Sequence, residues 1–306
     1  MKKILLLILL LSCNKIMGLK VFKNKDINED LVLAIINNET DKAIELIKQG
    51  ADVYHNHEST NVLELVLDKR NLDVLKILLK KEIELSKDNT VKIYDLALDD
   101  FNYDIIDLIK DKYKLEEALI DKNKYFLLLC YTSNATEVRK FIEKNNINPK
   151  EIKDKFNRDG LIISAVSNKM EVIKMLIEEY HFDINSKNNN GITSLMAACN
   201  QNNKETVELL IERGANVNDN EKDGWPPLML ASENGHTEIA KLLIDRGANV
   251  NKREEDKWTS LMIASQNGHA ETLKLLIDEG ANVNDKNNNG WTALMVASQK
   301  GHTETV

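Results

Sequence analysis

The amino-acid sequence predicts an all-α fold, a solenoid of stacked helix-turn-helix units joined by hairpin loops. Two observations predict it: a 33-residue unit recurs in the C-terminal part of the chain, and each copy carries apolar residues at the spacing of two short helices. The composition agrees, because 42% of the 306 residues are apolar, 29% are charged and only 3 are proline. Such a chain can form a packed and mainly helical structure.

Residues 1–18 differ from the rest of the chain and predict an export signal. Lys2 and Lys3 precede an unbroken apolar run over residues 4–11, which is followed by Ser12 and Cys13. The run is far shorter than the roughly 20 residues that span a bilayer, so a retained membrane helix is disfavoured.

Residues 10–13 resemble the lipobox of bacterial lipoproteins, in which a Leu stands three residues before the acylated Cys. The resemblance implies cleavage before Cys13 and a lipid on its side chain, which would anchor the protein to a membrane. Two alternatives stay open, namely simple export without a lipid and a chance match over four residues.

Residues 19–187 predict degenerate copies of the unit. The clearest copy lies at residues 28–53, where Ala34 precedes Gly50 by 16 residues, as Ala231 precedes Gly247. Paired helical periodicity continues near residues 60–88, 90–115, 121–150 and 155–187, although most of their turn residues are lost. We therefore expect helices throughout this region and leave their register open.

Residues 188–306 hold the well-formed copies. Four equivalent positions, each 33 residues from the last, are Gly191, Gly224, Lys257 and Gly290. A Thr stands at the expected N-cap of the following helix in three copies, at Thr193, Thr259 and Thr292. Pro226 and Pro227 replace the Thr and its neighbour in the remaining copy, and the first helical turn tolerates proline because it has no backbone donor to lose there.

Each first helix is predicted to end at a glycine and to be followed at once by a second helix. Gly235, Gly268 and Gly301 precede a His, and glycine most easily adopts the left-handed conformation that ends a helix. The buried face of the second helix is predicted at Leu242, Leu243 and Ile244 and at Leu275, Leu276 and Ile277. Because no unit can bury its apolar face alone, stacking is required.

These copies resemble the ankyrin repeat, whose motif reads Gly-x-Thr-Pro-Leu-His-x-Ala, then Gly-His, Leu-Leu and Gly-Ala-x-Val-Asn. The resemblance is close over roughly the last 120 residues and weaker over the preceding 160, which implies about eight full repeats and a partial one. The last copy stops at Val306 within its second helix, so we expect the sequence to be a fragment of a longer solenoid, unless that end packs on a partner or on itself. Apolar packing is expected to replace the motif's His hydrogen bond at Met196, Met229, Met262 and Met295.

Histidines are the first candidates for metal ligands. His236, His269 and His302 share one context, but neighbouring helices pack about 8–10 Å apart, whereas zinc ligands lie about 2 Å from one ion. We therefore expect structural hydrogen bonds from these imidazoles. His55 and His57 flank Asn56 in a loop, and two ligands alone make a weak site. The sequence predicts no metal site.

Several other functions are disfavoured. A net charge of -8, without a basic stripe, would repel nucleic acid. The sequence contains no nucleophile with a base, no paired carboxylates outside the repeats and no glycine-rich phosphate loop, so we predict neither catalysis nor a cofactor. Cys130 and Cys199 fall in helical segments two units apart, and we expect no disulfide between them.

The three tryptophans of the chain are the candidate binding residues. Trp225, Trp258 and Trp291 stand at the same place in successive copies, directly after the loop tip. The ankyrin resemblance implies that this place lies on hairpin fingers beside a concave groove that contacts partners, with loop tips at Lys222, Asp223, Glu255, Asp256, Asn288 and Asn289. Tryptophan is enriched at interface hot spots. Alternatively, each Trp packs only against the next finger.

We therefore expect a non-catalytic scaffold of ankyrin repeats that binds protein. The leader adds an expectation of export to the periplasm or the cell surface, with membrane anchoring if Cys13 is acylated. A secreted ankyrin effector or inhibitor of host proteins is one alternative, and a metal-binding protein or enzyme near His55 and His57 is another. The resemblance implies a class of partner, and neither a particular protein nor an oligomeric state.

Overall fold

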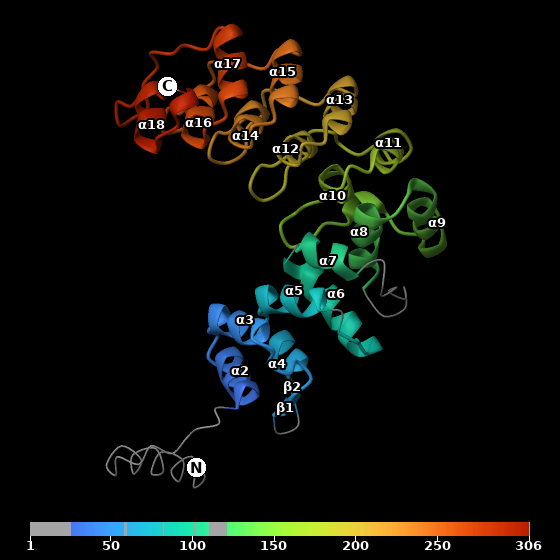
Figure 1. Cartoon of the computed structure of the whole chain (residues 1–306). Coiled ribbons are helices and arrows are strands. Elements are labelled where there is room, and N and C mark those ends of the chain that lie inside the picture. Colours follow the sequence, from blue (N-terminus) through green and yellow to red (C-terminus); the bar gives the residue numbers. More distant parts are fainter. Residues whose placement is uncertain (1–25, 58–59, 82, 101, 110–120, 306) are drawn as a thin grey trace, which may run out of the picture. The chain divides into compact units, whose positions relative to one another are not determined.

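The computed structural model describes residues 26–57, 60–81, 83–100, 102–109 and 121–305 (Figure 1). The described residues divide into two compact units. The first unit contains residues 26–97 and 102–109, and the second contains residues 98–100 and 121–305. The predicted leader at residues 1–18, with Cys13, lies outside the described residues.

The first unit consists of helix pairs and one short hairpin. Its helices are α2 (Ile27–Ile36), α3 (Thr40–Lys48), α4 (Val62–Asp68), α5 (Leu72–Lys80), α7 (Tyr103–Ile109) and residues 87–97 of α6 (Lys87–Asp100). Strands β1 (Asn56–His57) and β2 (Thr60–Asn61) pair antiparallel ahead of α4. Helix α2 packs on α3 and α4, and α5 packs on α3, α4 and α7. The core is aliphatic, with Ile35, Ile47 and Leu75 among its fully buried side chains.

The second unit contains two rows of short helices, which Figure 1 shows most clearly from α12 onward. The first helices of the repeats are α8 (Lys122–Thr132), α10 (Gly160–Val166), α12 (Ser194–Asn200), α14 (Pro227–Glu233), α16 (Ser260–Asn267) and α18 (Ala293–Lys300). The second helices are α9 (Ala135–Asn145), α11 (Met170–Glu178), α13 (Lys204–Glu212), α15 (Thr237–Asp245) and α17 (Ala270–Asp278). Two short 3₁₀ helices, η2 (Pro149–Glu151) and η3 (Thr303–Thr305), complete the unit.

Packing in the second unit runs from each repeat to the next. Every first helix contacts the first helix of the following repeat, from α8 to α18, and the second helices do the same from α9 to α17. This arrangement confirms the predicted all-α solenoid of helix-turn-helix units with hairpin loops. It also explains why the small residues Ala231, Ala264 and Ala297 are fully buried, since a neighbouring helix approaches closely at each.

The predicted helix boundaries are confirmed. The Thr193 side chain accepts a hydrogen bond from the Met196 backbone N–H, and Thr259 and Thr292 cap α16 and α18 in the same way. Pro226 is the N-cap of α14. The glycines that end the first helices have φ angles of +70° at Gly235 and +75° at Gly268 and Gly301.

Several repeats, two of them degenerate, form this turn with asparagine in place of glycine. Where the later repeats have glycine, Asn38, Asn168 and Asn202 adopt φ angles of +58°, +56° and +59°. Asparagine tolerates this left-handed region better than most residues, because its short side chain bonds locally. Arg70 also adopts it, with φ +52°. Some of the degenerate repeats therefore keep the turn although they have lost its glycine.

The predicted buried face of the second helices is also only partly right. Leu243 is fully buried, but Leu242 and Ile244 beside it are partly exposed, and Ile239 and Ala240 complete the buried stripe. Consecutive helical residues point about 100° apart, so three in a row cannot share one face. The equivalent Ile277 is 42% exposed.

The methionines at the place of the motif's His are core residues in three repeats. Met196, Met229 and Met262 are at most 1% exposed, which confirms that apolar packing takes the place of the His hydrogen bond. Met295 is 51% exposed, because no following repeat covers it among the described residues.

Candidate protein-binding surface

Five loops of the second unit share one turn, and we call them fingers. They comprise residues 154–158, 188–192, 221–225, 254–258 and 287–291. In each finger, the backbone N–H of the first residue donates to the carbonyl oxygen of the fifth over 3.0–3.2 Å. The side chain of the first residue also accepts hydrogen bonds from the N–H groups of the third and fifth residues over 2.7–3.0 Å.

This turn requires an acceptor side chain at the first position. The residues there are Asp154, Asn188, Glu221, Glu254 and Asn287. Each stands four residues before the last residue of its finger, which is Trp in the final three. The sequence interpretation missed these positions, although an Asp, Asn or Glu at almost constant spacing was a visible signal for a side-chain-stabilised turn.

Backbone hydrogen bonds join three of the four pairs of neighbouring fingers. The Asn189 N–H donates to Phe156 O over 2.8 Å, Lys222 N–H to Asn190 O over 2.9 Å, and Asn288 N–H to Asp256 O over 2.9 Å. These bonds align the fingers in a row.

The three tryptophans are the fifth residues of the last three fingers. Trp225, Trp258 and Trp291 are each partly buried, so part of each residue remains exposed to solvent. The predicted tip residues Lys222, Asp223, Glu255, Asp256, Asn288 and Asn289 are all exposed. The side-chain amide of Asn288 donates to Asp256 Oδ1 over 3.2 Å, which joins two of these tips.

A pocket of about 300 Å³ brings together three of the predicted residues. Trp258, Trp291 and Asn289 line it. The other lining residues are Gln266, Asn287, Val296, Gln299 and Lys300. Trp225 and the remaining five tip residues are not among the lining residues. The row of residues that the sequence indicates therefore contains a concave feature between its last two fingers.

The repeated histidines hold neighbouring repeats together. His236 Nε2–H donates to Asn200 O over 3.3 Å, His269 Nε2–H to Glu233 O over 2.8 Å, and His302 Nε2–H to Gln266 O over 3.0 Å. Each acceptor lies near the end of the preceding first helix, so the bonds satisfy carbonyl oxygens there that have no partner within the helix. The expectation of structural hydrogen bonding is confirmed.

Earlier repeats form the same bond with other residues. Asn203 Nδ2 donates to Ala165 O over 2.8 Å, and Lys169 Nζ donates to Thr132 O over 2.9 Å. Any side-chain donor of suitable length serves at this place. The degenerate repeats therefore stack by the same contact as the regular ones.

The loops at residues 215–218, 248–251 and 281–284, each with the sequence Ala-Asn-Val-Asn, provide a second link between repeats. Asn218 Oδ1 accepts from Asn249 N–H over 2.9 Å, and its amide donates to Gly247 O over 3.0 Å. Asn251 makes the same pair of bonds with Asn282 N–H and Gly280 O. The asparagines thus hold successive loops in register.

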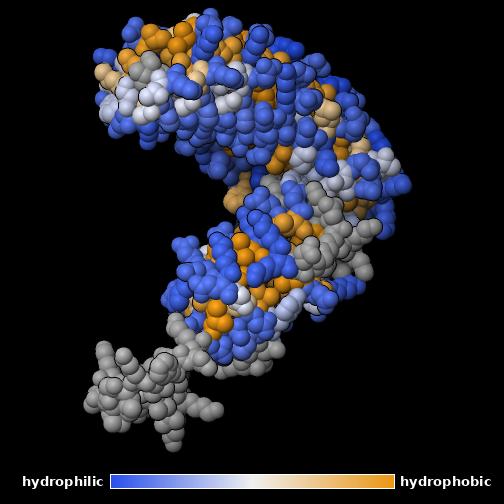
Figure 2. Space-filling model, in the orientation of Figure 1, coloured by the Kyte–Doolittle hydropathy of each residue, from blue (hydrophilic) through white to orange (hydrophobic). Residues whose placement is uncertain are grey.

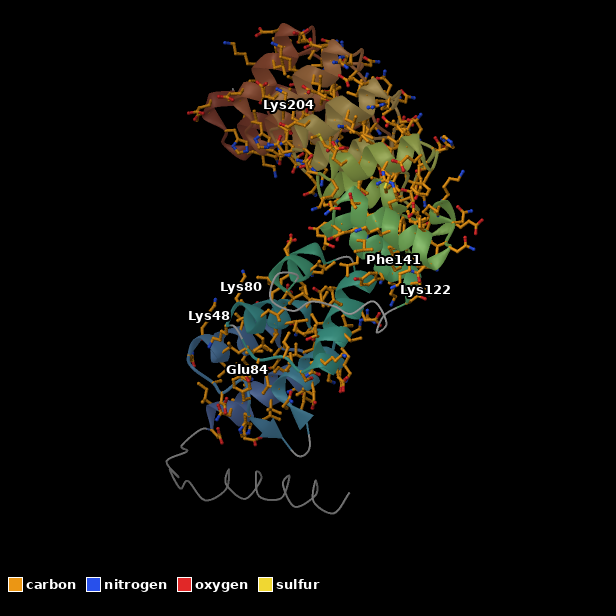
Figure 3. All side chains as sticks on the ribbon, turned by 90° about the vertical axis from the view of Figure 1, so that its right-hand side faces the viewer. Lys48, Lys80, Glu84, Lys122, Phe141 and Lys204 are labelled. Atoms are coloured by element: carbon orange, nitrogen blue, oxygen red, sulfur yellow. The ribbon has the colours of Figure 1, made fainter. Side chains whose placement is uncertain are left out.

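The second helices carry ion pairs between repeats on a largely hydrophilic surface (Figure 2). Lys204 of α13, labelled in Figure 3, contacts Glu238 of α15 over 3.0 Å. Arg139 of α9 donates two hydrogen bonds to Glu179, and these lower the pKa of that carboxyl group. Both pairs are exposed to solvent, so they add little to stability.

The weaker candidates have ordinary surroundings. His55 Nε2 lies 3.3 Å from Glu29 Oε1, and the His57 side chain lies outside the described residues. No group of three potential metal ligands occurs in the part of the chain that the structure describes.

Cys130 and Cys199 are free thiols, and complete burial raises the pKa of each. Within the same part of the chain, every helix is too short or too polar to cross a membrane.

Comparison with known proteins agrees with the repeat geometry. Residues 161–254 and 247–306 match the family described as ankyrin repeats in three copies. The chain is similar to the NAD-dependent deacetylase sir2B of Dictyostelium discoideum, with 28% identity over 198 residues, which cover 60% of this chain and 25% of that protein. It is also similar to alpha-latrocrustotoxin-Lt1a of Latrodectus tredecimguttatus, with 26% identity over 115 residues, or 35% of this chain and 8% of the toxin.

The chain thus spans at most a quarter of the length of either relative. The family match begins at the start of α10 and continues through α18, where the repeats share helix pairs, fingers and inter-repeat hydrogen bonds. Residues 161–306 are thus similar to ankyrin repeats, and their stacked helix pairs and hairpin loops form an ankyrin-type solenoid.

Proposed function

We propose that the protein is a non-catalytic scaffold that binds another protein through its row of fingers. One observation carries the proposal: three successive fingers hold a Trp at the same position, partly buried and beside exposed tips. An indole held by a stabilised turn loses little conformational entropy on binding, and it can bury a large apolar area against a partner.

The test replaces all three tryptophans with alanine. A partner is first isolated with the chain from Cys13 onward from the native organism, and its affinity is then measured by calorimetry. We expect Trp225→Ala, Trp258→Ala and Trp291→Ala together to weaken binding by at least about 30-fold, the size of a hot-spot loss of about 2 kcal/mol.

A matched control separates binding from stability. Leu33, Ile36 and Tyr54 are also exposed apolar side chains, at 49%, 37% and 57%, and they lie in the first unit. Their triple alanine variant should bind with unchanged affinity. If the Trp variant keeps full affinity for the isolated partner, or loses it only in proportion to its lower melting temperature, the finger row is not the binding surface.

The absence of catalysis is part of the proposal. The two described thiols support it, because their burial and raised pKa make them poor nucleophiles. The likeness to a deacetylase covers a quarter of that protein, so it is a weak basis for assigning its activity here. A metal-binding or enzymatic function near His55 and His57 is the competing proposal. Stoichiometric metal in the purified full-length protein would favour it.

We also propose export and, through Cys13, a lipid anchor. The two lysines, the apolar run and the Leu-Leu-Ser-Cys sequence at residues 10–13 support both. Cells fed clickable palmitate should label the wild-type chain but not a Cys13→Ser variant. If the wild type carries no label and its mature form appears in the medium, the secreted effector or inhibitor replaces the anchored scaffold.

A further inference from the structure

The pocket between the last two fingers is lined by an amide donor that has no hydrogen-bond partner among the described residues. Asn287 is only 6% exposed and lines the pocket. Its Oδ1 accepts from the N–H groups of Asn289 and Trp291, both over 3.0 Å, which fixes the orientation of the amide. Its Nδ2 makes no hydrogen bond with any residue that the structure describes. This amide is therefore available to donate to an acceptor that enters the pocket.

The other Trp-bearing fingers lack this donor. Glu221 and Glu254 make the same turn with carboxylate oxygens, which only accept hydrogen bonds. Asn188 is the other amide, but its finger ends in Ile192 in place of Trp. The donor and the indoles therefore coincide at one finger, residues 287–291.

The charge of the pocket is opposite to that of the whole chain. Lys300 is its single charged lining residue, it is exposed, and it forms no ion pair within the described residues. The remaining polar lining groups are neutral, namely the indole N–H groups of Trp258 and Trp291 and the side-chain amides of Gln266, Gln299, Asn287 and Asn289. In a protein of net charge -8, this pocket is a local cationic site.

We propose that this pocket binds the carboxylate of an Asp or Glu side chain in an extended segment of the partner protein. The inference rests on the proposed function. The carboxylate accepts from Asn287 Nδ2 and pairs with Lys300, its methylene groups pack between Trp258 and Trp291, and the glutamine amides can bond the backbone beside it. A basic side chain would face Lys300 and find no carboxylate in the lining.

The test uses displayed ten-residue random peptides selected on the full chain, and the selected sequences are then synthesised with amidated C-termini. Amidation leaves side chains as the only source of a carboxylate. Among the selected peptides, we expect those whose binding depends on Trp258 and Trp291 to carry an Asp or Glu at one common position. Replacing that residue with its amide should weaken binding by about tenfold or more.

Two variants probe the pocket itself. Asn287→Asp should keep the turn, because Asp154 forms the same two hydrogen bonds in its own finger, yet it removes the donor and adds a repelling charge. Asn287→Asp should lower the affinity for the acidic peptides by at least about tenfold, whereas the matched Asn188→Asp variant should leave that affinity unchanged. Lys300→Glu should shift a repeated selection towards Lys or Arg at the shared position.

The outcomes distinguish the two proposals. Peptides that depend on the tryptophans but show no acidic preference, or that tolerate Asn287→Asp, would overturn the carboxylate pocket and leave the finger row intact. Selection that yields only peptides indifferent to the Trp variants, or no peptides at all, would count against both.

Discussion

The Gly-His pairs predict that one added methyl group at Gly235 lowers the free energy of unfolding more than the same change at a glycine with open surroundings. Gly235 has φ +70°, and a Cβ added there would lie 2.6 Å from His269 Nδ1 and 2.9 Å from His269 Cγ and Cε1. The imidazole cannot move away freely, because its Nε2–H donates to Glu233 O over 2.8 Å. Gly235→Ala therefore strains its own backbone and also displaces the side chain that joins two repeats.

The expected loss has two parts. An alanine in the left-handed region costs about 1 kcal/mol. Overpacking against the imidazole, together with weakening of its hydrogen bond, adds about 1–3 kcal/mol. Gly247→Ala is the matched control, because Gly247 has φ +89° but nothing within 4 Å of an added Cβ. We expect losses of about 3 kcal/mol for Gly235→Ala and about 1 kcal/mol for Gly247→Ala.

Urea unfolding followed by tryptophan fluorescence measures this difference locally, since every Trp lies in the repeats around Gly235. A second variant, Gly235→Ala with His269→Ala, removes the ring that the methyl group meets. Its loss relative to His269→Ala alone should fall to about that of Gly247→Ala. Equal losses at Gly235 and Gly247 would refute the steric account.

Two further predictions concern the asparagine links and the buried thiols. Asn251→Ala removes two hydrogen bonds to the next repeat and should lower the free energy of unfolding by about 1–2 kcal/mol, whereas Lys252→Ala in the same loop should change it by less than about 0.5 kcal/mol. Burial raises the folded-state pKa of Cys130 and Cys199, so the folded state retains their protons after the unfolded chain has lost them. Above about pH 8.5 the free energy of unfolding should therefore fall by up to about 1.4 kcal/mol per pH unit for each thiol. Chemical denaturation between pH 7 and 10 checks this, and a pH dependence unchanged by Cys130→Ala and Cys199→Ala would contradict it.

Local features were predictable wherever one residue decides the geometry alone. A Thr hydroxyl can cap only the backbone N–H groups beside it, and a glycine is favoured wherever φ is positive, so Thr259 and Gly268 identify the ends of α16 from the sequence. The same reasoning missed the asparagines at positive φ in the earlier repeats, because asparagine is compatible with this conformation without being specific to it. It also assigned Leu242 and Ile244 to the core, since hydrophobicity does not specify which of three consecutive residues faces inward.

The period, the helix pairs and the position of the three tryptophans are properties of the sequence itself, because they depend on spacing within one unit. The contacts between units required the tertiary structure. The partner of each repeated His is a backbone carbonyl of the preceding repeat. Because every residue has such a carbonyl group, the sequence does not identify the one that accepts. The pocket depends likewise on Asn287, Gln266 and Lys300, which come from a finger and two helices and meet only because successive repeats stack. Sequence periodicity determines which residues recur, and stacking determines which of them meet.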